Sequence, residues 1–71
     1  MVINYHMAIM SKIKQIMEFR RVTVRGLADM TKLSTRTVMF ARGPQITQCR
    51  LETLVLIAAA LGVRVKDLFD E

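Results

Sequence analysis

The segment from Thr23 to Arg42 limits the possible folds of this chain more than any other stretch. Thr23 and Ser34 carry hydroxyl oxygens that can accept a hydrogen bond from a free N–H group in the first turn of a helix. Apolar residues follow each of them at helical spacing: Leu27, Met30 and Leu33 after Thr23, and Val38 and Ala41 after Ser34. The segment therefore predicts two short helices, the second over residues 35–42, joined by a turn at residues 31–33.

Two short helices joined at a large angle by a turn of about three or four residues form a helix-turn-helix unit. In such a unit the first helix is held by packing, and the outer face of the second can enter a DNA major groove. Residues 35–42 would then be the recognition helix. The same pattern also describes a fragment of any small α-helical bundle, so this segment favours DNA binding without requiring it.

Positive charge gathers in the part of the chain that contains this segment. The net charge is +5, but residues 1–50 hold nine Lys and Arg against two acidic residues, whereas residues 51–71 hold two against four. A basic region that coincides with a helix-turn-helix is expected of a surface that meets phosphates. The alternative is a solvated basic surface without a partner.

The composition predicts one small, compact, all-α domain. The chain has 71 residues, of which 52% are apolar, with three Gly and one Pro. Such a chain is apolar enough to fold, although a core of this size is marginal. The surplus of apolar residues in so small a domain indicates that part of its surface is covered by a partner.

Several functions are disfavoured by the residues that the chain lacks. Cys49 and His6 are the single cysteine and the single histidine, too few for an intrachain disulfide or a tetrahedral zinc site. Because there is also no nucleophile motif and no Gly-rich phosphate loop, we expect no enzymatic activity, metal or cofactor. The longest apolar run, residues 54–61, is far shorter than the ~20 residues of a membrane span. We therefore expect a cytoplasmic protein that does not associate with membranes.

The first residues are predicted to form an arm ahead of the domain. We expect an N-terminal arm over residues 1–7 and a helix-turn-helix domain over residues 8–71. Val2, Ile3 and Tyr5 favour an extended conformation in the arm. A disordered tail, a strand-like arm laid on a second subunit and an early start of the first helix all remain open.

The remaining helices follow from apolar periodicity and from breaks at glycine and proline. Apolar residues at i, i+4, i+7 and i+8 predict an amphipathic helix over residues 8–20. Gly43-Pro44 ends the recognition helix, and a loop over residues 45–48 follows. A strongly apolar helix is predicted over residues 48–61, with Thr47 as its candidate N-cap and Gly62 after its end. A last short helix over residues 65–69 brings the total to about five.

Several motifs together resemble those of the lambda-repressor-like, or XRE-type, helix-turn-helix family. They are Leu27-Ala28, Thr31-Lys32-Leu33-Ser34, Thr37-Val38, Leu54, Ile57-Ala58-Ala59-Ala60-Leu61-Gly62-Val63 and Asp67-Leu68-Phe69. The resemblance covers roughly residues 9–70, and the Ala-Leu-Gly-Val and Asp-Leu-Phe ending makes it fairly specific. It implies a compact five-helix domain, dimeric binding to palindromic operators, and transcriptional regulation of a repressor-like kind.

The chain departs from the family pattern at three places. Lys32 stands at a turn position that is usually glycine, which predicts a positive φ at a non-glycine residue. Val24 stands where a polar residue, often glutamine, usually opens the first helix of the motif, so a phosphate contact is missing there. The recognition helix also reaches Gly43 one residue early, and the loop to Leu51 is longer than usual.

The resemblance also implies which residues meet DNA. Thr35 and Arg36 match the positions that read base edges, and Arg36 suits a bidentate contact with guanine O6 and N7, worth ~1–3 kcal/mol of discrimination. Phe40 lies one turn later, where it would either meet a thymine methyl group or pack under the loop. The residues expected to contact the DNA backbone are Arg25, Lys32, Ser34, Thr37, Arg42 and Gln45.

The leading hypothesis is a sequence-specific DNA-binding regulator that acts as a homodimer on double-stranded DNA. We expect the dimer interface on the last two helices, with Val63, Val65 and Phe69 as candidates and a possible contribution from the arm. The alternative is a protein-interaction or antitoxin-type module. Its apolar arm and C-terminal helices would bind another protein, and DNA binding would be weak or secondary.

Overall fold

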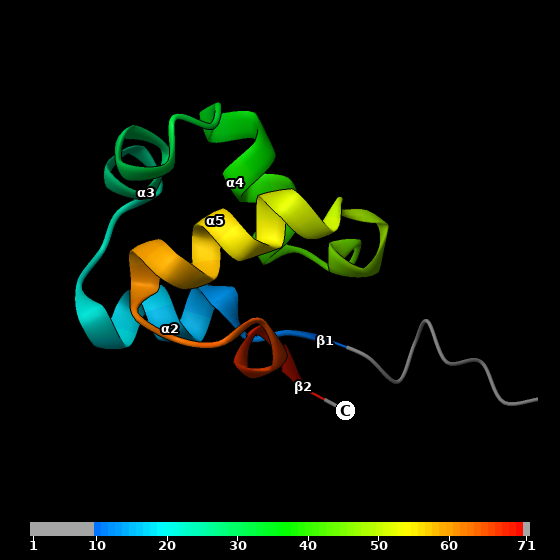
Figure 1. The fold of residues 1–71 in the computed structure, drawn as a ribbon. Coiled ribbons are helices and arrows are strands. Elements are labelled where there is room, and N and C mark those ends of the chain that lie inside the picture. Colours follow the sequence, from blue (N-terminus) through cyan, green and yellow to red (C-terminus); the bar gives the residue numbers. More distant parts are fainter. Residues whose placement is uncertain (1–9, 71) are drawn as a thin grey trace, which may run out of the picture.

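Four α-helices and two short 3-10 helices make up most of residues 10–70, the part of the chain that the computed structural model describes (Figure 1). The α-helices are α2 (Ile13–Arg20), α3 (Val24–Thr31), α4 (Thr35–Arg42) and α5 (Leu51–Leu61), and the 3-10 helices are η1 (Ile46–Gln48) and η2 (Val65–Leu68). The strands β1 (Met10–Ser11) and β2 (Phe69–Asp70) pair in antiparallel fashion, with Met10 opposite Asp70. The predicted all-α fold with a central helix-turn-helix is confirmed, although these residues form four α-helices and not about five.

The two predicted N-caps fix where the helices of the motif begin. The Thr23 hydroxyl accepts a hydrogen bond from the backbone N–H of Gly26 at 2.9 Å, and the Ser34 hydroxyl accepts one from the backbone N–H of Thr37 at 3.1 Å. Each hydroxyl thereby satisfies an N–H group that the helix itself leaves without a partner. Residues 24–31 and 35–42 form helices for this local reason.

The turn between α3 and α4 has the backbone that its sequence predicts. Lys32 ends α3 with φ 64°, in the left-handed region that favours glycine. The buried hydroxyl of Thr31 donates to the carbonyl of Leu27 at 2.7 Å and accepts from the N–H of Leu33 at 3.3 Å. These two bonds link the last turn of α3 to the first residues after it, so the strained residue lies between fixed neighbours.

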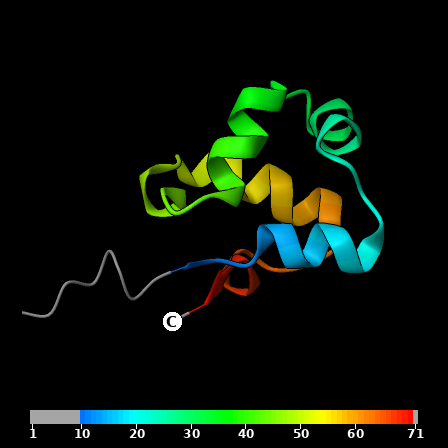
Figure 2. The same cartoon turned by 180° about the vertical axis from the view of Figure 1, so that it is seen from behind.

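A single core lies under the helix-turn-helix, with α5 through its middle (Figures 1 and 2). α5 contributes Leu54, Ile57, Ala58 and Leu61, and the other buried apolar side chains are Ile13, Met17, Leu27, Ala28, Val38, Ala41, Ile46 and Leu68. Residues at helical spacing in α2, α3 and α4 therefore face this core, as their apolar stripes predict. Leu51, Val55 and Leu56 face outward from α5 and stay exposed.

The first predicted helix begins later than its apolar stripe indicates. We expected it from residue 8, but α2 starts at Ile13, because the backbone before it pairs with the other end of the chain. The N–H of Lys12 donates to the carbonyl of Leu68 at 2.8 Å, and the Ser11 hydroxyl donates to the carbonyl of Ala41, also at 2.8 Å. The predicted arm over residues 1–7 lies outside the described residues.

Two further predicted helices have other bounds in the structure. The helix predicted from residue 48 starts at Leu51, and Thr47 is no N-cap, because residues 46–48 form a 3-10 turn whose Ile46 is fully buried. The helix predicted over residues 65–69 is the 3-10 helix η2, and Phe69 belongs to β2. Gly62 ends α5 with φ 73°, as expected of a residue that follows a helix.

Candidate nucleic-acid interface

The outer surface of α4 consists of side chains that the core does not use. Val38 and Ala41 are fully buried, and because each residue of an α-helix is turned by about 100° from the last, Arg36 lies on the opposite side. The exposed side chains of α4 are Thr35, Arg36, Met39 and Phe40. α4 lies beside α3 at one end of the molecule (Figures 1 and 2). A helix held by its inner face in this way can present its outer face to a major groove.

The three predicted base-contacting residues lie on this surface. Thr35 and Arg36 are exposed in the first turn of α4, and Phe40 is 38% exposed one turn later. Phe40 is absent from the buried core, so the structure favours the outward of its two predicted arrangements. In residues 10–70 the single salt bridge joins Arg50 to Glu52 at 3.6 Å. The guanidinium of Arg36 is therefore not held by a carboxylate from that part of the chain.

The six residues predicted to contact the DNA backbone fall into three groups. Arg25, Lys32 and Gln45 are exposed, at the start of α3, in the turn and after α4. Ser34 and Thr37 form the N-cap of α4, and their hydroxyl oxygens lie 2.9 Å apart. Arg42 is half-buried, and its Nε atom is buried without a hydrogen-bond partner in the described residues. The first group is free to meet phosphates, the second holds the helix terminus, and the third points partly into the protein.

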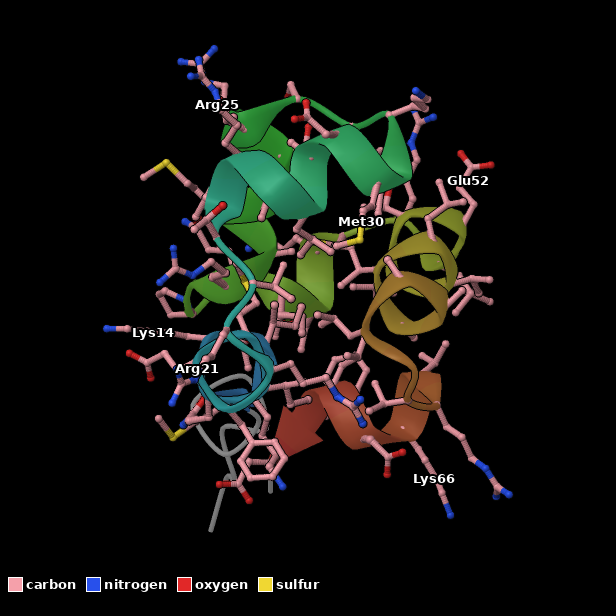
Figure 3. The ribbon with its side chains drawn as sticks, turned by 90° about the vertical axis from the view of Figure 1, so that its left-hand side faces the viewer. Lys14, Arg21, Arg25, Met30, Glu52 and Lys66 are labelled. Atoms are coloured by element: carbon pink, nitrogen blue, oxygen red, sulfur yellow. The ribbon has the colours of Figure 1, made fainter. Side chains whose placement is uncertain are left out.

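The helix-turn-helix shares its basic character with α2. Figure 3 shows Arg25 of α3 pointing away from the protein on the side where Lys14 of α2 and Arg21, the residue that follows α2, also point outward. Glu52, on α5, points to the opposite side of that view. Lys66 points to the same side as Glu52, so basic side chains lie on both sides, and three of them surround the start of α3 and the ends of α2.

The described residues also report on other kinds of chemistry. In residues 10–70 no three His, Cys, Asp or Glu side chains are grouped so that they could hold a metal ion. Cys49 is half-buried, and burial raises the pKa of its thiol. None of the helices in that range has the length and apolar character needed to cross a membrane.

The geometry agrees with a comparison against protein families. A family model for the Cro/C1-type HTH DNA-binding domain matches residues 12–70, which include every helix from α2 to η2. The chain belongs to the Cro/C1-type HTH family. The resemblance to lambda-repressor-like proteins is thereby confirmed, and the protein is a DNA-binding regulator. A search among curated proteins found no match.

The departures of this Cro/C1-type domain from its family pattern have structural explanations. Val24 is half-buried and packs against the core, where a polar side chain would instead reach toward DNA. The long loop after α4 is anchored by Ile46, which is fully buried. Lys32 accepts the positive φ that glycine usually provides, at a cost of about 1–2 kcal/mol. The Cro/C1 fold is thus retained, with fewer polar groups at the start of α3.

One exposed residue of the recognition helix was missed by the sequence analysis. Met39 is 62% exposed, more than Phe40 beside it. The family resemblance drew attention to the first turn of the helix and to Phe40. The spacing of the buried residues could have identified Met39, because Val38 and Ala41 define an inward side from which Met39 is turned away.

Proposed function

We propose that this Cro/C1-type protein is a homodimeric, sequence-specific repressor that binds a palindromic operator through α4. The observation that carries the proposal is the outer face of α4, which exposes Thr35, Arg36 and Phe40 while Val38 and Ala41 hold the helix on the core. Such a protein needs no catalytic group, because occupancy of the operator is enough to block transcription. A cytoplasmic location, with direct access to DNA, fits this role.

The side chains divide the work of recognition between bases and phosphates. Arg36 donates to guanine O6 and N7, while Thr35 and Phe40 meet neighbouring base edges. The phosphate contacts come from Arg25, Lys32 and Gln45, and from the paired hydroxyl groups of Ser34 and Thr37 at the N-terminus of α4. The Arg42 side chain moves outward on binding, and its Nε atom then donates a hydrogen bond to a phosphate oxygen.

A second copy of the chain is the proposed occupant of the outer face of α5. Leu33, Leu51, Val55 and Leu56 line an open groove there, together with Glu52 and Thr53. Two chains of net charge +5 repel each other where their basic side chains meet, whereas α5 carries Glu52 as its single charged residue. Val63, Val65 and Phe69 pack partly against the core and contribute only their exposed edges to this contact.

The α5 groove also gives the alternative function a specific location. A protein-interaction or antitoxin-type module would use the same apolar side chains to bind a different protein. The two alternatives differ in their dependence on DNA. A regulator binds a defined DNA sequence tightly by itself, whereas an interaction module would bind DNA weakly and without sequence preference.

Selection of bound sequences from a random DNA pool tests the proposal. We expect an enriched palindrome whose half-sites are centred about 10–10.5 base pairs apart, one turn of DNA. Binding to the selected site should weaken steeply with salt, because each phosphate contact contributes about 0.9 to the slope of log K against log salt. Enrichment of no sequence, together with a shallow salt dependence, would overturn the proposal in favour of the interaction module.

A further inference from the structure

The exposed face of α4 has an apolar side chain on each side of Arg36. At about 100° per residue, Met39 is turned by about 60° from Arg36 in one direction and Phe40 by about 40° in the other. Along the helix axis the three residues lie within about 6 Å of one another, since each residue rises about 1.5 Å. This distance corresponds to one or two base-pair steps of about 3.4 Å.

Met39 has no visible role in holding the fold. It is 62% exposed, is not among the side chains that pack on the core, and stands between Val38 and the exposed Phe40. Exposing a flexible apolar side chain on a basic surface gains nothing in water. The same side chain gains from contact when an apolar group of a ligand covers it.

We propose that Met39 is a specificity-determining residue that contacts the C5-methyl group of a thymine next to the guanine read by Arg36. This inference rests on the proposed function and deepens it. The thymine methyl is the apolar group that a major groove presents at base edges. Met39 and Phe40 together would enclose the Arg36–guanine contact between apolar side chains, so the preferred half-site has a thymine within two base pairs of that guanine.

The contact has a measurable size. Burial of one methyl-sized group against an apolar side chain changes affinity about fourfold, which corresponds to ~0.8 kcal/mol. Deoxyuridine differs from thymidine only by lacking this methyl group. Replacing the contacted thymine with deoxyuridine should therefore weaken binding of the unaltered protein by about fourfold and leave its hydrogen bonds intact.

The experiment crosses this DNA change with substitutions in the protein. Each thymine of the selected site is replaced in turn by deoxyuridine, and affinities are measured for the unaltered chain, Met39→Ala and Met30→Ala. Met30 is a matched control, because it is also an exposed methionine but lies on α3 and points toward α5 (Figure 3). Both variants replace exposed side chains, and circular dichroism verifies their folding.

We expect one thymine whose replacement weakens the unaltered chain and Met30→Ala by about fourfold but has no effect on Met39→Ala. A deoxyuridine penalty of equal size in Met39→Ala at every position would overturn the inference, as would a selected site without thymine within two base pairs of the guanine. In both cases the unaltered chain still binds a preferred sequence, so the proposed function would stand. Failure of the proposed function differs, because no sequence would then be preferred.

Discussion

Replacing Lys32 with glycine is expected to stabilise the protein. Lys32 has φ 64° and ψ 18°, is exposed, and makes no salt bridge in residues 10–70. A non-glycine residue in this conformation costs about 1–2 kcal/mol. Glycine removes that cost but loses about 0.4–1 kcal/mol through the greater freedom of the unfolded chain. At the mid-values of these two ranges, the expected net gain in the free energy of unfolding is about 0.8 kcal/mol.

Thermal denaturation followed by circular dichroism measures this gain, and for a domain of this size we expect a rise in Tm of roughly 3–6 °C. Lys32→Ala is the matched control, because it removes the charge but keeps the strained backbone, and its Tm should hardly change. Gly62→Ala reverses the change at a second left-handed position, with φ 73°, and should lower the Tm. The reasoning is refuted if Lys32→Gly and Lys32→Ala shift the Tm equally, since backbone strain would then play no part.

Two further predictions concern the cap of α4 and the outer face of α5. Ser34→Ala should lower the free energy of unfolding by about 1 kcal/mol in urea denaturation, because the N–H of Thr37 loses its acceptor. Ser34→Asp keeps an acceptor and should retain the stability of the unaltered chain, so equal losses in both variants would contradict the capping role. Leu56→Glu should leave the circular dichroism spectrum helical and convert a dimer to a monomer in sedimentation at high micromolar concentration. Phe19→Glu, at another exposed apolar side chain, should leave the dimer intact. A dimer that survives Leu56→Glu would place the interface elsewhere.

The local features of the fold were predictable because short-range chemistry sets them. Thr23 and Ser34 cap helices through N–H groups three residues away. Gly62 follows its helix in a conformation that glycine adopts freely, and the family pattern marks Lys32 as strained. Arg21 adopts the same left-handed conformation, with φ 57°, but the family pattern does not single out its position. There the bond from the N–H of Val22 to the carbonyl of Met17, at 2.9 Å, closes the end of α2.

The features that the sequence did not predict depend on contacts between distant segments. The apolar stripe extends the first helix back to residue 8, but the Ser11 hydroxyl bonds to the carbonyl of Ala41, thirty residues away. The same pairing of chain ends draws Phe69 into a strand. The apolar periodicity of one helix cannot show that its first residues instead bond to a distant segment.

For the candidate site, the sequence predicted which residues lie on the outer face of α4 better than it predicted which side chains are buried. Thr35, Arg36 and Phe40 lie on the outer face of α4, as their matches to the family motif imply. Motif positions do not show which side chains are buried in the core and which stay exposed. For this reason the exposure of Met39 and the partial burial of Arg42 were not predicted. The assignment of these side chains to bases or phosphates remains a prediction.

In the proposed complex, Arg36 reads a base while Arg25 holds the DNA backbone. Arg36 stands on the outer face of α4, and Arg25 at the start of α3, which crosses the backbone in a helix-turn-helix complex. The most direct test measures the affinities of Arg36→Ala and Arg25→Ala for the selected site and for a scrambled site at two salt concentrations.

We expect Arg36→Ala to lose about 1–3 kcal/mol on the selected site and much less on scrambled DNA. Arg25→Ala should weaken both DNAs alike and reduce the slope of log K against log salt by about 0.9, the value of one phosphate contact. Equal losses of affinity for the two DNAs in Arg36→Ala would contradict the claim, because Arg36 would then act only as a charge near the backbone.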